Sequence, residues 1–73
     1  MCFLKLTEIQ KKLIFNLRVL RNSKNLSQSE LADKLSISKE YLNRIENGHA
    51  FPSPALLDKI CILFEIKPAE LFL

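Results

Sequence analysis

The sequence predicts an all-α protein of five short helices, and three observations lead to that prediction. Apolar residues recur at helical spacing throughout, and no segment keeps the alternation of a strand. Residues suited to capping precede four of the five helical segments. With 73 residues, the chain has room for a single hydrophobic core. We therefore expect one domain over residues 1–73, with residues 1–6 as an N-terminal arm.

The expected helices cover residues 7–23, 27–35 and 38–47, and two more begin at Ser53 and Pro68. Two of their starts have the spacing of a capping box, in which a hydroxyl residue is followed three positions later by Glu or Gln. These boxes are Thr7 with Gln10 and Ser27 with Glu30.

Helical periodicity also predicts which side chains are buried. In the first helix the expected stripe is Ile9, Leu13, Leu17 and Leu20. The other expected core residues are Leu31, Ala32, Leu35, Leu42, Ile45, Leu57, Ile60, Cys61, Phe64 and Leu71.

Residues 27–47 have the features of a helix-turn-helix. Only Ser36 and Ile37 separate the second expected helix from the third, so the two helices must cross steeply. Ala32 supplies the small residue needed where they cross, and Ile37 supplies an apolar residue for the joint. This arrangement leaves one face of helix 38–47 free.

That free face carries polar side chains able to read base edges in a major groove. Arg44 can pair with guanine and Asn43 with adenine. Lys39 can reach a guanine or a phosphate, Glu40 can accept from a cytosine amine, and Ser38 lies at the tip. Any one of these residues alone is more often a solvated surface residue. The prediction of double-stranded DNA as partner depends on their combination with the crossing and the turn.

Charge supports the same prediction modestly, because the net charge is +3. Residues 1–49 contain nine Lys and Arg against five Asp and Glu, a balance of +4, and residues 50–73 contain two against three, a balance of −1. A polyanion is therefore expected to bind the N-terminal two-thirds.

Other classes of function find little support in the composition. Cys2, Cys61 and the single histidine, His49, lack the number and spacing of a zinc site. No glycine-rich phosphate loop and no nucleophile–base pair is present. We expect no enzyme activity, metal, cofactor or small-molecule ligand. The short apolar cluster before Lys5 is too brief for a signal peptide or a membrane span, so we expect a cytoplasmic protein.

The chain closely resembles the lambda-repressor-like, or XRE-type, helix-turn-helix family of transcriptional regulators over residues 17–71. The resemblance is carried by Leu-Ser-Gln-x-x-Leu-Ala at 26–32, Ile-Glu-Asn-Gly at 45–48 and Pro-Ser at 52–53. Together these motifs are highly specific. They imply a compact five-helix DNA-binding domain with its helix-turn-helix at about 27–47.

The resemblance also implies roles for individual residues. It implies base contacts for Gln28, Ser38, Lys39, Glu40 and Arg44, to which the chemistry of the free face adds Asn43. It implies phosphate contacts for Ser27 and Asn47, and we expect one for Tyr41 as well. It implies a structural ion pair between Arg21 and Glu46.

One departure from the family concerns the end of the second helix. Family members usually have glycine where this chain has Ser36, so a left-handed backbone there is expected to cost roughly 1 kcal/mol.

Surplus apolar residues indicate an interface. Phe15 and Val19 lie opposite the core stripe of the first helix, and Ile62 faces outward from the fourth. A homodimeric repressor acting on a palindromic operator is the favoured function, and restriction-modification controllers are included in it. An antitoxin that binds both its operator and a toxin is the main alternative. A protein-interaction module without DNA binding is the third reading, which the basic free face disfavours.

Overall fold

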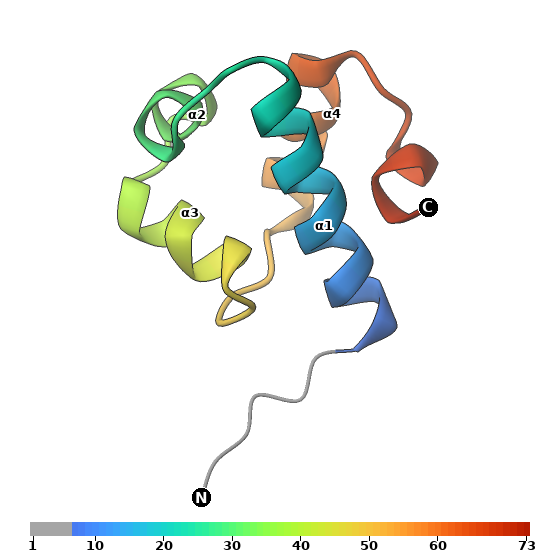
Figure 1. Cartoon of the computed structure of the whole chain (residues 1–73). Helices are drawn as coiled ribbons and strands as arrows, with labels where there is room; N and C mark the ends of the chain where they lie inside the picture. Colours follow the sequence, from blue (N-terminus) through green and yellow to red (C-terminus); the bar gives the residue numbers. More distant parts are fainter. Residues whose placement is uncertain (1–6) are drawn as a thin grey trace, which may run out of the picture.

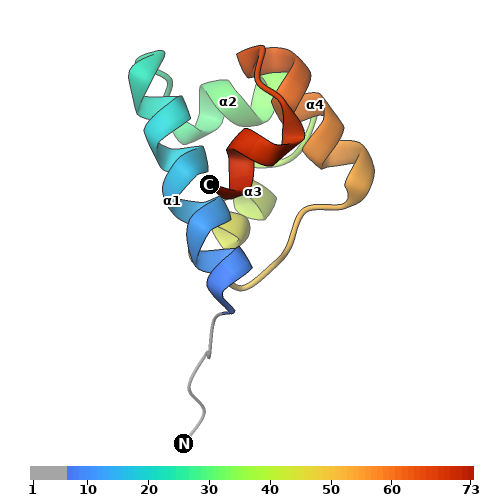
Figure 2. The same ribbon diagram turned by 90° about the vertical axis from the view of Figure 1, so that its right-hand side faces the viewer.

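The computed structural model describes residues 7–73, and all regular structure in that range is helical, as the sequence predicts. The elements are α1 (Glu8–Ser23), α2 (Gln28–Leu35), α3 (Lys39–Glu46), α4 (Pro54–Phe64) and a 3-10 helix, η1 (Pro68–Phe72). Figure 1 shows α2 and α3 to one side of α1 and η1 on the other. The turned view shows η1 between α1 and α4 (Figure 2). The predicted N-terminal arm lies outside the described residues.

Each α-helix begins beside a hydroxyl residue that caps it. At α1 the Thr7 hydroxyl accepts from the Gln10 N–H at 3.1 Å, and the Gln10 side chain accepts from the Thr7 N–H at 3.1 Å. The caps of the other three helices are Ser27, Ser38 and Ser53. Because each cap satisfies a backbone donor that has no partner within its helix, the starts predicted from the sequence are confirmed.

The prediction of five helices is wrong in one respect, because the described residues contain four α-helices and η1 is a 3-10 helix. Its five residues make little more than one turn, and the Glu70 N–H bonds to the Lys67 carbonyl at 2.9 Å, three residues back. Short segments commonly adopt this tighter winding. Leu71 still points into the core, where it is fully buried.

The core lies between the four α-helices and η1. Its buried apolar residues are Leu13, Leu17, Leu31, Ala32, Leu35, Leu42, Ile45, Leu56, Ile60, Cys61, Phe64 and Leu71. All but Leu56 belong to the predicted set.

Three predicted core positions need correction, and one of them, Leu20, is half-buried against the core. Ile9 is 58 % exposed, because the first turn of α1 extends beyond the elements that cover Leu13 and Leu17. On α4, Leu57 is only half-buried while Leu56 is 4 % exposed. The helix presents Leu56 and Ile60 to the core, and its Leu57 side faces η1 instead.

Candidate nucleic-acid interface

The turn between α2 and α3 takes two residues. Ser36 adopts a left-handed backbone, with φ 59° and ψ 40°, and the Ile37 N–H bonds back to the Ala32 carbonyl at 3.0 Å. Ala32 is 2 % exposed at the crossing, and Ile37 is half-buried against the core. Ser38 then caps α3. The predicted crossing, apolar joint and left-handed serine are all present.

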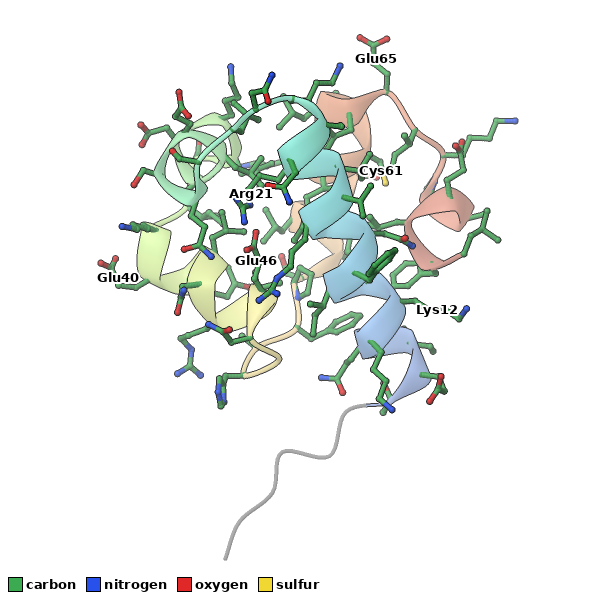
Figure 3. The ribbon with its side chains drawn as sticks, in the orientation of Figure 1. Lys12, Arg21, Glu40, Glu46, Cys61 and Glu65 are labelled. Atoms are coloured by element: carbon green, nitrogen blue, oxygen red, sulfur yellow. The ribbon has the colours of Figure 1, made fainter. Side chains whose placement is uncertain are left out.

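Helix α3 has two different faces. Leu42 and Ile45 are buried, whereas four of the predicted base-contacting residues form a shallow hollow on the exposed side: Lys39, Glu40, Asn43 and Arg44. Glu40 points away from the body of the protein (Figure 3). The Arg44 guanidinium donates to the His49 carbonyl at 3.3 Å and is otherwise exposed. Ser38 is exposed at the start of the same helix.

Glu46, the last residue of α3, is 1 % exposed. Its carboxylate accepts from Arg21 Nε at 2.9 Å and from Arg21 Nη2 at 3.1 Å. Figure 3 shows the two side chains facing each other between α1 and α3. Arg18 adds a second cation, with its Nε 3.8 Å from the same carboxylate. The sequence resemblance points to Arg21 but does not point to Arg18.

Three predicted DNA-contacting residues, Gln28, Asn43 and Asn47, are hydrogen-bonded to one another. Gln28 Nε2 donates to Glu46 Oε1 at 2.9 Å. Asn43 Nδ2 donates to Gln28 Oε1 at 3.3 Å, and Asn47 Nδ2 donates to Asn43 Oδ1 at 3.0 Å. The sequence analysis treats these residues separately. The four-residue spacing of Asn43 and Asn47 is the signal in the sequence that indicates the hydrogen bond between these two asparagines.

The remaining predicted phosphate contacts have different surroundings. The exposed Ser27 hydroxyl accepts from the Glu30 N–H at 3.1 Å. Ser27 also lies at the positive end of α2. Tyr41 is half-buried and packs against the core, which leaves its phenol ring less freedom to move toward a backbone phosphate.

Within residues 7–73, no group of three or more His, Cys, Asp and Glu side chains is placed to hold a metal ion. None of the helices in that range is both long and apolar enough to cross a membrane.

Comparison with known proteins identifies the family. The family model described as helix-turn-helix matches residues 17–71. The ImmF control region 10 kDa protein of Bacillus phage phi105 is 41 % identical over 56 residues, covering 77 % of this chain and 62 % of the relative. The transcriptional regulator SlrR of Bacillus subtilis is 39 % identical over 57 residues, covering 77 % and 38 %. The antitoxin PezA of Streptococcus pneumoniae is 36 % identical over 56 residues, covering 77 % and 35 %.

A solved structure matches over nearly its whole length. The restriction-modification controller protein C.AhdI from Aeromonas hydrophila superimposes with a TM-score of 0.77 at 33 % identity, covering 86 % of this chain and 96 % of that one. The chain therefore belongs to the helix-turn-helix family, and within it to the XRE type of DNA-binding transcriptional regulators. It spans less than two-thirds of the length of each of the three sequence relatives.

Proposed function

We propose that this chain is a sequence-specific DNA-binding regulator that inserts α3 into the major groove of an operator and represses transcription as a homodimer. The observation that carries the proposal is the exposed polar face of α3, backed by a buried carboxylate that two arginines bind. An α-helix fits the major groove, and Lys, Asn and Arg side chains match the donors and acceptors of base edges there.

The proposed base contacts are made by Gln28, Ser38, Lys39, Glu40, Asn43 and Arg44, and the proposed phosphate contacts by Ser27, Tyr41 and Asn47. The exposed start of α2 supports the phosphate role. Ser27 is exposed there, and the N–H groups of the first turn of a helix attract anions.

Exposed apolar side chains support the homodimer. Phe15 is 67 % exposed, Ile62 73 % and Leu73 78 %, which is more apolar surface than a small monomer requires. We propose that residues 66–73 form the interface, extended by the arm at residues 1–6. The arm lies outside the described residues. Two copies on a palindromic site would place their α3 helices about 34 Å apart, one helical turn of DNA.

Salt dependence and sedimentation test these two parts. Affinity for a selected duplex should fall steeply between about 50 and 200 mM salt, because neutralised phosphates release counterions. An affinity that stays constant over this range would remove DNA as the ligand. Sedimentation of the chain with and without that duplex should show a dimer, and monomers alone at high concentration would contradict the homodimer.

An antitoxin role is the second candidate, and the relative that favours it is PezA. In that case the exposed apolar residues would contact a toxin. Co-expression with the product of the neighbouring gene distinguishes the two functions. A stable hetero-complex that relieves growth arrest supports the antitoxin, and a homodimer unaffected by that product supports the repressor.

A further inference from the structure

Polar side chains from α1, α2 and α3 form a closed ring, whose members are Arg18, Gln28, Asn43, Glu46 and Asn47. Arg18 Nη2 donates to Asn47 Oδ1 at 3.5 Å, and Asn47 donates in turn to Asn43. Asn43 donates to Gln28, and Gln28 donates to Glu46. Glu46 and Arg18 close the ring through their charges, 3.8 Å apart. Every hydrogen bond therefore runs in the same direction, from the guanidinium to the carboxylate.

The two charged ends set that direction. A guanidinium can only donate and an ionised carboxylate can only accept, whereas an amide does both and can be turned either way. Because Glu46 accepts, the Gln28 nitrogen must face it, and the Gln28 oxygen must face Asn43. The Asn43 nitrogen then faces Gln28, and its oxygen faces Asn47. The buried carboxylate thus orients an exposed amide two hydrogen bonds away.

This orientation limits what Asn43 can offer to a base. One of its two amide hydrogens is taken by Gln28, and one lone pair of its oxygen is taken by Asn47. One donor and one acceptor remain. Adenine presents the matching pair in the major groove, the N7 acceptor and the N6 donor, whereas guanine presents two acceptors.

We propose that Glu46, acting through Gln28, is a positioning residue that sets the base preference of Asn43 to adenine in one orientation of the A·T pair. The inference rests on the proposed function, because it takes Asn43 to contact a base. Glu46 itself touches no DNA. If the carboxylate is replaced by an amide, only the Arg18–Asn47 hydrogen bond still imposes the direction of the ring, and at 3.5 Å it is the longest of these bonds. Asn43 can then turn over to meet T·A as well.

The test is selection from a random duplex library with the full chain, followed by competition between duplexes that differ at one base pair. Asn43→Ala locates the position that Asn43 reads. There the unaltered protein should prefer A·T over T·A and over G·C by roughly ten-fold. Glu46→Gln should reduce this preference to about three-fold or less and leave the preference at the Arg44 position unchanged.

The matched control is Glu30→Gln, the same chemical change at an exposed residue of the same motif. Glutamine also serves at the third position of a capping box, so α2 keeps its start, and Glu30 makes no bond to the ring. This variant should keep the full preference at both positions. A ratio of affinities does not change with the fraction of folded protein, so partial unfolding of Glu46→Gln does not imitate the expected result.

A second variant keeps the ion pair and breaks only the link. Gln28→Met leaves Arg21 and Glu46 paired and removes the one amide group between Glu46 and Asn43. It should relax the preference at the Asn43 position as Glu46→Gln does. If both variants weaken all duplexes equally and keep the ten-fold preference, the positioning role is overturned while DNA binding stands. If the unaltered protein selects no sequence at all, the proposed function fails and the inference fails with it.

Nuclear magnetic resonance of the free protein provides a readout without DNA. One side-chain amide proton of Gln28 and one of Asn43 should be protected from exchange with water in the unaltered chain. In Glu46→Gln that protection should be lost. Rapid exchange of both protons in the unaltered chain would overturn the inference and leave the proposed DNA binding untouched.

Discussion

The guanidinium of Arg21 binds both carboxylate oxygens of Glu46, at 2.9 and 3.1 Å, and so joins the last turn of α1 to the last residue of α3. A negative charge at the end of a helix is unfavourable against the helix dipole. Here the carboxylate is 1 % exposed and offset by Arg21, Arg18 and the Gln28 amide. The pair is therefore a structural clamp that holds α3 at its angle to α1.

Removal of one partner from this clamp should destabilise the fold strongly. Arg21→Ala leaves a buried carboxylate with only Arg18 and Gln28, and one-sided breakage of buried pairs costs about 3–5 kcal/mol. We expect the lower end of that range, because these two partners remain. The free energy of unfolding in urea measures the effect. Arg21→Ala with Glu46→Ala should cost less than the sum of the single changes, and strict additivity would show that the two residues are not coupled.

Ser36 is a position where the chain should gain stability. Its backbone has φ 59° and ψ 40°, which costs a residue with a Cβ atom about 1 kcal/mol and costs glycine nothing. Ser36→Gly should therefore raise the free energy of unfolding by about 1 kcal/mol. As control, Ser29→Gly in the exposed first turn of α2 should lower it by about 0.5 kcal/mol. Equal losses at both positions would contradict a left-handed Ser36.

Glu30 should make the fold sensitive to acid. The backbone N–H and the hydroxyl of Ser27, followed by the charge of Lys34, hold the pKa of its carboxyl below the ordinary value of 4.5. Since the folded pKa is the lower one, the stabilisation is complete above about pH 4.5 and is lost as the pH falls through the folded pKa. Carboxyl groups of this kind titrate between about pH 5 and pH 3. Over that range the melting temperature of Glu30→Gln should consequently fall less than that of the unaltered chain. Parallel curves would exclude this contribution.

Arg44 is the residue whose loss should change sequence preference most directly. Arg44→Ala should weaken binding to the selected duplex by roughly 1–3 kcal/mol and relax the preference at one base pair. Lys12→Ala is a control of similar charge, because Lys12 is exposed on α1 and points away from α3 (Figure 3). It should leave the sequence preference unchanged. Equal weakening of all sequences by Arg44→Ala would assign Arg44 to a phosphate instead.

Local rules account for most of what could be predicted about the fold. Each α-helix starts at a residue whose hydroxyl accepts from the backbone N–H three positions later. Thr7 and Ser27 could therefore be identified by spacing alone. The buried faces of α2 and α3 follow from helical periodicity in the same way. Periodicity fails for Ile9, because it identifies the face of a helix but not how far a neighbouring element extends along it.

The sequence by itself determined the helical class, the helix-turn-helix and the identity of the residues on the exposed face of α3, because each depends on neighbours at most a few positions apart. Only the tertiary structure decided that Arg18, 28 positions before Glu46, closes a ring with the amides of Gln28, Asn43 and Asn47. Those contacts join α1, α2 and α3. Which side chains come within hydrogen-bond distance depends on how α1 and α2 cross α3. Hydrogen-bond direction is a property of the assembled network, since an amide has no preferred orientation until a charged neighbour supplies one.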